Sequence, residues 1–136
     1  MRANIKTTVV LIAFLLTAVM SYDSQAGDIQ PSALELARLP KFCWAQFKDP
    51  IPGPEYRIPK GCGYAMNHYC YGLIYLHRAK NAFGDKSKRI GNLDHAKSDT
   101  LYTIAGMKDW PNCPIRGHVE NTLNEIQLAL RGLGRK

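Results

Sequence analysis

The stretch Gly61–Lys80 limits the possible folds more than any other part of this chain. It contains Cys62 and Cys70, and it belongs to a helical pattern that runs from Tyr64 to Phe83. Apolar residues recur there at spacings of three and four and cover two adjacent faces. One face consists of Met66, Tyr69, Cys70, Leu73, Leu76 and His77, and the second of Ala65, Gly72, Tyr75, Ala79 and Phe83. A helix with so wide an apolar surface is expected at the centre of the fold, with other elements on two sides.

The amino terminus has the pattern of a secretory signal peptide. Arg2 and Lys6 form a basic start, an apolar run follows from Val9 to Met20, and a group of small residues ends at Ala26. We expect residues 1–26 to be removed, which makes the mature protein periplasmic or secreted. A membrane anchor is the alternative interpretation, but the apolar run is short for a bilayer span.

Residues 27–136 are expected to form one small helical domain with no transmembrane segment. The chain has 136 residues and a formal net charge of +7, with 18 Lys and Arg against 11 Asp and Glu. Such a basic balance is compatible with an anionic partner and also with an ordinary solvated surface. The basic residues are scattered apart from the run Lys86–Arg89, which argues against nucleic acid as a partner.

The cysteines indicate how so small a domain is stabilised. All four lie in the expected mature part, at Cys43, Cys62, Cys70 and Cys113. An even number in an exported chain indicates two disulfide bonds, for which three connectivities are possible. Four thiolates around a metal ion are the alternative, but the spacings contain no C-x-x-C pair and an oxidising compartment disfavours free thiolates. The sequence therefore predicts a disulfide-stabilised domain without a cofactor.

The amino-terminal part of the domain combines a broken helix with a proline-rich segment. Ser32–Phe47 is predicted as the first helix, with a capping box from its first residue to Glu35 and an interruption at a proline. Lys48–Lys60 contains four prolines and is expected to be extended, as a strap packed across a helical pair. The expected anchors of this strap are Tyr56 and Ile58.

Two further helices complete a predicted all-α, four-helix fold. After a polar loop over Gly84–Arg89, the third helix is expected at Ile90–Asp109 and the fourth over residues 114–133. The residues expected to face inward from the third helix are Ile90, Leu93, Ala96, Leu101, Ile104 and Met107. Those expected from the fourth are Ile115, Val119, Leu123, Ile126, Leu130 and Leu133.

Short connections make successive helices antiparallel, and this arrangement brings the four cysteines to one end of the fold. Cys43 lies near the end of the first helix, and Cys113 follows the third. Cys62 and Cys70 flank the start of the second helix. Cys43 and Cys70 lie at a similar depth from that end, which favours one bond between them and a second bond between the other two. Pairing Cys43 with Cys62 instead would also leave both bonds at this end.

The second and third predicted helices resemble a tetratricopeptide-type helix pair. Gly72 and Tyr75 keep the Gly-x-x-Tyr spacing of the first helix in that repeat. Ala96 stands where the second helix has a small residue, and Pro111 closes the unit. The helices and their loop are longer than the repeat allows, and Thr100 stands where an aromatic residue is usual.

The resemblance extends more loosely to other parts of the chain. The sequence also contains the motifs CWAQF, GPEYRIPKGCG, MNHYC and MKDWPNCPIR. This set looks like a small exported bacterial family described as tetratricopeptide-like. The resemblance implies a binding or scaffolding role without catalysis.

The predicted function is therefore a non-catalytic protein-interaction or scaffolding module of the cell envelope. The chain has no G-x-S-x-G, no H-E-x-x-H and no glycine-rich phosphate loop. A protein partner is expected in a groove beside the second helix, because Tyr and Arg are enriched at binding hot spots. The candidate contact residues are Tyr64, Asn67, His68, Tyr71 and Arg78.

Two alternative functions stay open at this point. A small periplasmic metal-binding or redox protein could use Met66, His68 and the cysteines, because Met and His are suitable copper ligands. An enzyme that acts on envelope glycans could use Glu55 and Asp109 as a carboxylate pair. A Met on an apolar helical face more often belongs to the core, and an isolated carboxylate is more often solvated, so the interaction module remains the first choice.

Overall fold

The structure is a computed structural model that describes residues 29–135. Every regular element in this range is helical, as the all-α prediction requires. The elements are α1 (Ala33–Arg38), η1 (Lys41–Gln46), η2 (Pro54–Tyr56), α2 (Met66–Asn81), α3 (Lys86–Gly106), η3 (Met107–Asp109) and α4 (Arg116–Gly132), where η marks a 3-10 helix. The predicted signal peptide lies outside the described residues. Within them, no helix has the length and apolar character needed to cross a membrane.

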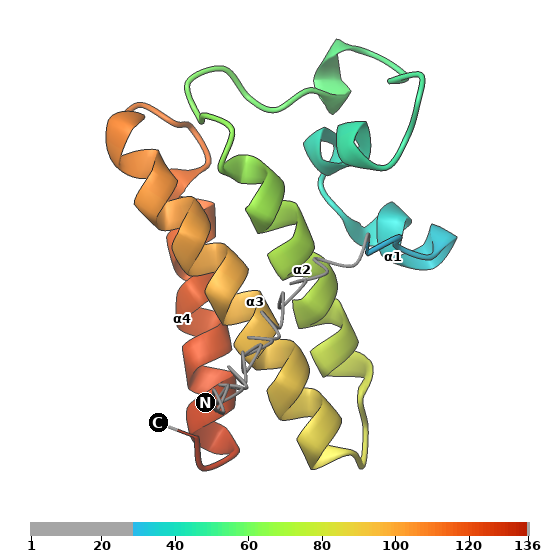
Figure 1. Cartoon of the computed structure of the whole chain (residues 1–136), viewed down its shortest axis with the longest axis vertical. Helices are drawn as coiled ribbons and strands as arrows, with labels where there is room; N and C mark the ends of the chain where they lie inside the picture. The colour runs from blue at the N-terminus through green and yellow to red at the C-terminus, as the bar shows by residue number, and fades with distance from the viewer. Residues whose placement is uncertain (1–28, 136) are drawn as a thin grey trace, which may run out of the picture.

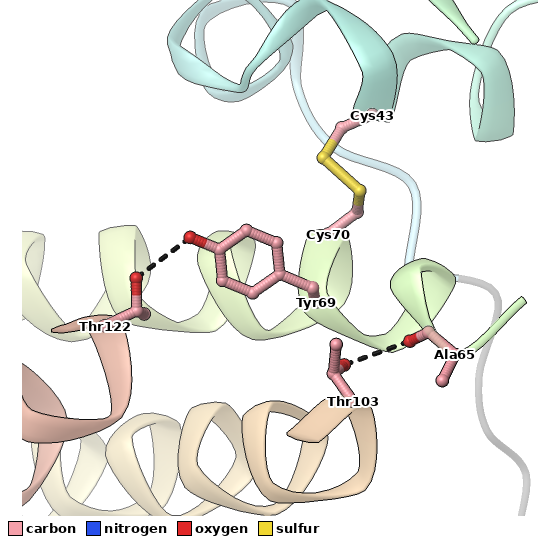
Figure 2. The surroundings of a disulfide bond; sticks show 6 residues. All are labelled: Cys43, Ala65, Tyr69, Cys70, Thr103 and Thr122. Carbon is pink, nitrogen blue, oxygen red and sulfur yellow. Dashed lines mark hydrogen bonds between the residues drawn. A yellow bond between two sulfur atoms is a disulfide. The ribbon is translucent and has the colours of Figure 1, made fainter. Parts of the chain in front are cut away.

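Three long helices, α2, α3 and α4, form an antiparallel bundle in which α3 contacts both of the others (Figure 1). The first two approach closely at Gly72, where a Cβ atom would lie 3.1 Å from Thr100 Oγ1 and 3.3 Å from the carbonyl oxygen of Ala96. Between α2 and α4, the Tyr69 hydroxyl lies 2.9 Å from Thr122 Oγ1 (Figure 2). Burial raises the pKa of Tyr69, so the phenol stays neutral in this buried hydrogen bond.

Apolar side chains fill the bundle in two clusters, one toward each end. The cluster at the cysteine end also draws on α1 and η1, and its buried members are Leu36, Leu39, Cys43, Cys62, Met66, Tyr69, Cys70, Leu73, Ile74, Met107, Cys113 and Val119. The other cluster comes from the three long helices alone, and its buried members are Leu76, Ala79, Leu93, Ala96, Ile126 and Leu130. The residues before α2 therefore complete only one end of the core.

Residues 29–60, which we call the N-terminal segment, lie against α2 (Figure 1). The predicted capping box is present: the Glu35 backbone N–H donates to Ser32 Oγ at 3.2 Å, and the Ser32 backbone N–H donates to Glu35 Oε2 at 2.8 Å. The chain is interrupted at Pro40, as expected, and continues as the 3-10 helix η1. The predicted first helix is thus two short elements. The described fold has three long helices instead of four.

The proline-rich strap, Lys48–Lys60, is extended apart from the single turn of η2. The Tyr56 ring packs on Trp44 with a centroid separation of 5.4 Å, and Lys41 Nζ lies 5.5 Å from the centre of the same ring. Both partners belong to η1, so this part of the strap packs on one short helix and not across a helical pair as predicted. Ile58, the second expected anchor, packs against the core cluster at the cysteine end.

The start of α3 also differs from the prediction. This helix begins at Lys86, so a polar loop over Gly84–Arg89 was wrong for most of its length. Asp85 accepts a hydrogen bond from the Lys88 backbone N–H at 2.8 Å and caps the helix. The run of cations therefore occupies the first turn of a helix.

Two apolar residues predicted to face inward are exposed. Phe83 is 89% exposed because α2 ends before it and the chain turns at Gly84, where φ is 77°. Leu101 is exposed because the buried stripe of α3 continues through Thr100 and Thr103, both at 0% exposure. The hydroxyls of these threonines lie 2.7 and 2.9 Å from carbonyl oxygens four residues earlier, which satisfies them inside the core.

Candidate functional site

A groove lies between the first turn of α2 and the last turns of α3, near the cysteine end of the bundle. Its volume is about 500 Å³, and it is lined by Tyr64, Ala65, Asn67, His68, Tyr102, Ala105 and Gly106. We call it the aromatic groove. It brings together three of the predicted contact residues, Tyr64, Asn67 and His68, and adds residues of α3 to them.

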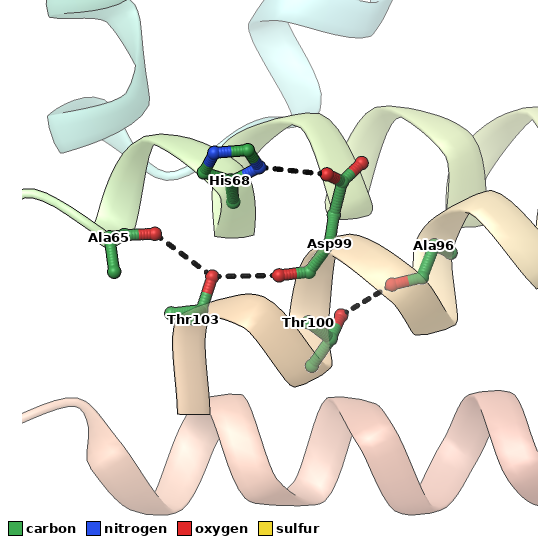
Figure 3. Close-up of polar contacts among 6 residues, drawn as sticks. All are labelled: Ala65, His68, Ala96, Asp99, Thr100 and Thr103. Carbon is green, nitrogen blue, oxygen red and sulfur yellow. Dashed lines mark hydrogen bonds and ion pairs between the residues drawn. The ribbon is translucent and has the colours of Figure 1, made fainter. Parts of the chain in front are cut away.

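Small residues form the floor of the groove and let the two helices meet. A Cβ atom at Gly106 would collide with the Cβ atom of Ala65, so only glycine permits this approach. The buried Thr103 hydroxyl lies 3.0 Å from the carbonyl oxygen of Ala65 and 2.9 Å from that of Asp99 (Figure 3). The single hydroxyl proton of Thr103 thus lies within reach of a carbonyl oxygen at the start of α2 and of another within α3.

An imidazole–carboxylate pair lies at the side of the groove. His68 Nδ1 is 3.0 Å from Asp99 Oδ1 (Figure 3). The carboxylate accepts this hydrogen bond, so Nδ1 carries the proton in the neutral ring and Nε2 remains as an acceptor for a ligand. The Tyr102 ring packs against the imidazole, with a centroid separation of 4.0 Å. The His68 side chain is 42% exposed, so this fixed ring is accessible to a ligand.

The rim of the groove is aromatic and exposed. Tyr64 is 90% exposed and Tyr102 is 58% exposed. Tyr64 lies close after Cys62, whose disulfide bond holds this connection in place. Within the residues that the structure describes, the one imidazole–carboxylate contact that we find at the groove is that of His68 with Asp99. The site can therefore bury an apolar or aromatic group and orient it by hydrogen bonds.

The other two predicted contact residues lie outside the aromatic groove. Tyr71 packs edge-to-face on Phe47, with ring centroids 5.8 Å apart. Arg78 forms a bidentate ion pair with Glu35. Its Nε donates to Oε1 at 2.7 Å, and its Nη2 donates to Oε2 at 3.3 Å. The hydrogen bond from Arg78 is the main reason that the pKa of Glu35 falls from 4.5 to about 2. Both residues hold the N-terminal segment against α2.

The four cysteines form the two predicted disulfide bonds. Cys43–Cys70 joins η1 to α2 with a Cα–Cα distance of 5.5 Å (Figure 2). Cys62–Cys113 joins the connections before α2 and before α4 with a Cα–Cα distance of 4.5 Å. Both bonds lie at one end of the bundle, so the predicted pairing and the predicted convergence are confirmed.

The alternative metal site finds little support in the described residues. All four thiols are in disulfide bonds, and the Met66 side chain is fully buried in the core. His68 turns Nδ1 toward Asp99. Across residues 29–135, no group of three or more His, Cys, Asp or Glu side chains lies close enough together to hold a metal ion.

The sequence analysis missed the half of the groove that α3 provides. Asp99, Tyr102 and Gly106 recur at spacings of three and four, so they follow one side of the helix. That spacing was the available signal. The predicted inward stripe of the third helix runs through Leu101 and masks this spacing, and the register between α2 and α3 depends on packing.

The comparisons with known proteins add no assignment. No protein-family model, no curated protein and no solved structure matches this chain.

Proposed function

We propose that this protein is an exported, non-catalytic interaction or scaffolding module that binds a segment of a protein partner in the aromatic groove. The observation that carries the proposal is the pair of exposed tyrosines, Tyr64 and Tyr102, above a floor of small residues. Exposed aromatic side chains beside a concave apolar surface are typical of binding hot spots.

The groove is held in shape before any partner binds. The Cys62–Cys113 bond restrains the connection that leads to Tyr64, and Thr103 links the two helices below. Asp99 and Tyr102 fix the His68 ring. Side chains already in place lose little conformational freedom on binding, which favours affinity in a small interface.

The lining indicates the chemistry of the partner. A volume of about 500 Å³ accommodates one or two large side chains, with the rest of the partner on the surface. We expect an aromatic or aliphatic side chain between the tyrosines. A neighbouring backbone N–H could donate to His68 Nε2, and the Asn67 amide could both donate and accept.

Two further features support an exported helical module. The disulfide bonds are of the kind that persists in oxidising compartments outside the cytosol. The close packing of Gly72 against Ala96 fits the proposed tetratricopeptide-like helix pair, in which small residues let two helices meet. In such helix pairs an exposed groove is a common place for a bound segment.

The test is site-specific photocrosslinking in the producing cell. A photoreactive side chain at Tyr64 should give a discrete adduct with one protein, whereas the same group at Leu128, exposed on α4, should not. Adding Tyr102→Ala should remove the adduct. With the purified partner, Tyr102→Ala should weaken binding about tenfold or more, and Leu128→Ala should leave it unchanged.

The crosslinking result separates the groove from general adhesion. An adduct that persists in Tyr102→Ala, or that forms equally from position 128, would contradict the proposed site. Tyr102 is 58% exposed and packs on His68 alone among the aromatic contacts of the described residues, so its replacement should change the free energy of unfolding by no more than about 1 kcal/mol. A loss of binding would then not come from unfolding.

A further inference from the structure

The end of the bundle opposite the disulfide bonds has a protruding aromatic side chain. Phe83 is 89% exposed in the tight turn between α2 and α3, at the lower end of the molecule in Figure 1. Its neighbours Ala82 and Gly84 offer little cover. A single exposed phenyl ring is common on protein surfaces, so Phe83 becomes informative only together with the charged side chains near it.

Cations follow Phe83 closely in the sequence. Lys86, Lys88 and Arg89 come three to six residues after it and are all exposed in the first turn of α3. None of the ion pairs among the described residues includes any of the three. Asp85 is engaged as the helix cap. Positive charge is also unfavourable beside the positive end of the helix dipole, and the one acidic side chain in this turn is Asp85.

A cationic groove continues from this tip toward α1. Its volume is about 570 Å³, and it is lined by Ser32, Leu34, Glu35, Arg38, Arg78, Asn81, Ala82, Lys88 and Asn92. Three cations face one carboxylate there, and Arg78 already holds that carboxylate at 2.7 Å. Leu34 adds a second exposed apolar side chain at the far end of the groove.

We propose that this end of the molecule docks on the surface of a bilayer that contains anionic phospholipids. Phe83 enters the boundary between headgroups and acyl chains, while Lys86, Lys88 and Arg89 contact the anionic headgroups. A phosphate of one headgroup lies in the cationic groove near Arg38. Aromatic and basic side chains together are the pattern by which peripheral proteins bind such surfaces.

The combination of charge and apolar surface selects a bilayer over a soluble anion. A soluble phosphate would satisfy the cations but would leave Phe83 and Leu34 in water. An anionic bilayer offers negative headgroups and apolar chains within a few ångströms of one another. The surface is also distinct from the aromatic groove, which lies toward the other end of the bundle, so docking leaves that groove open.

The test is cosedimentation of the purified, oxidised protein with phosphatidylcholine vesicles, with and without phosphatidylglycerol. Binding is expected only when phosphatidylglycerol is present, and it should weaken as NaCl is added. Replacing Lys86, Lys88 and Arg89 together by alanine should weaken binding about a hundredfold, since each cation near an anionic surface contributes about fivefold. The triple variant Lys48→Ala, Arg57→Ala, Lys60→Ala removes equal charge from exposed strap positions and should retain binding.

Phe83 is tested by removal and by use as a reporter. Phe83→Ala should weaken binding about tenfold, because the ring no longer leaves water. Phe83→Trp should bind like the unmodified protein, and brominated acyl chains should quench its fluorescence more than that of the 2 native tryptophans. Tyr102→Ala should leave vesicle binding unchanged, so failure of this proposal and failure of the proposed partner site are distinguishable.

Three results would overturn the docking proposal. Equal losses in the two triple variants would show that binding follows net charge alone. Unchanged binding of Phe83→Ala, with an unquenched Phe83→Trp, would show that the tip does not enter the bilayer. Full release by inorganic phosphate, at an ionic strength where NaCl does not release the protein, would indicate a site for soluble anions.

Discussion

The N-terminal segment and the three-helix bundle are held in place by different means. In the bundle, buried apolar side chains run from the cysteine end to the opposite end. The N-terminal segment buries only Leu36, Leu39 and Cys43 among its described residues. It is fixed by one disulfide bond, by the ion pair of Glu35 with Arg78, and by aromatic contacts.

A proline-rich segment can therefore be ordered without a core of its own. Its prolines exclude a regular helix, and a segment of this length cannot bury enough apolar surface to offset the entropy of ordering it. A few strong, specific contacts replace a continuous core. Each of them is therefore expected to affect the segment more than the bundle.

The largest effect is expected from the disulfide bonds. Replacing Cys43 and Cys70 by alanine opens a loop of 27 residues and should lower the free energy of unfolding by about 3.5 kcal/mol. Replacing Cys62 and Cys113 opens a loop of 51 residues, for about 4 kcal/mol. Denaturant unfolding of the two double variants measures both values.

Hydrogen exchange shows which region of the molecule each disulfide bond stabilises. Without Cys43–Cys70, the amides of α1 should exchange much faster while those of α3 keep their protection, because only the N-terminal segment is released. Without Cys62–Cys113, protection should fall throughout the bundle. If the α1 amides stay as protected as those of α3 in the first variant, the segment does not depend on this bond.

The next effect comes from the ion pair between Glu35 and Arg78. The pKa of Glu35 in the folded protein, about 2, lies below its ordinary value of 4.5. The pair with Arg78 therefore contributes its full stabilisation when the pH is above 4.5. This contribution is lost as the pH falls from 4.5 toward 2. Because the pair is partly open to water, Glu35→Gln should cost about 1–2 kcal/mol at pH 7.

Urea unfolding at several pH values measures this contribution. The difference between Glu35→Gln and the unmodified protein should shrink as the pH is lowered through that window. Glu125→Gln is the matched control, because Glu125 pairs with Lys80 on the open surface and should change stability by less than about 0.5 kcal/mol. Equal effects of the two variants would contradict a special role for Glu35.

A smaller effect is expected at the strap. Tyr56→Ala removes the ring that packs on Trp44 and lies under Lys41, and it should cost about 1 kcal/mol. Tyr56→Phe keeps the ring and should behave like the unmodified protein. A change below about 0.5 kcal/mol for the alanine variant, measured by urea unfolding, would place Tyr56 among uninvolved surface residues.

Local patterns in the sequence were sufficient for much of the fold. The capping box at Ser32 and the break at Pro40 follow from single residues with strong conformational effects. The disulfide pairing followed from topology, because Cys43 in η1 and Cys70 in α2 lie at a similar depth from the cysteine end of the fold. These features depend on chain direction and spacing, which a sequence contains.

Other features depended on contacts that no local pattern contains. Thr100 and Thr103 are buried because each hydroxyl finds a carbonyl oxygen, which a count of apolar residues overlooks. Arg78 was predicted as a contact residue, but its guanidinium is paired with Glu35, at a sequence separation of 43. The aromatic groove needed the register between α2 and α3, so only the residues of α2 could be named in advance.

The smallest effect is expected from His77, which reports whether the N-terminal segment is docked. Its Nδ1 atom is buried without a hydrogen-bond partner. Burial is the main cause that lowers the pKa of His77 below 6.5, and the cations Lys80 and Arg38 add to it. Glu35 and Glu125 act in the opposite direction. The imidazole of His77 therefore binds a proton more readily in the unfolded chain than in the folded one. His77 leaves the free energy of unfolding unchanged above pH 6.5 and lowers it as the pH falls below 6.5.

An NMR titration of the imidazole measures this docking directly. When Cys43 and Cys70 are replaced, the N-terminal segment should withdraw together with Arg38, and water should reach the ring. The pKa of His77 should then rise toward its ordinary value. In the variant that lacks Cys62–Cys113, studied below its melting temperature, the segment stays bonded to α2 and the titration should be unchanged. If the first variant also leaves the titration unchanged, the bundle alone buries His77, and the disulfide bond does not hold the segment against it.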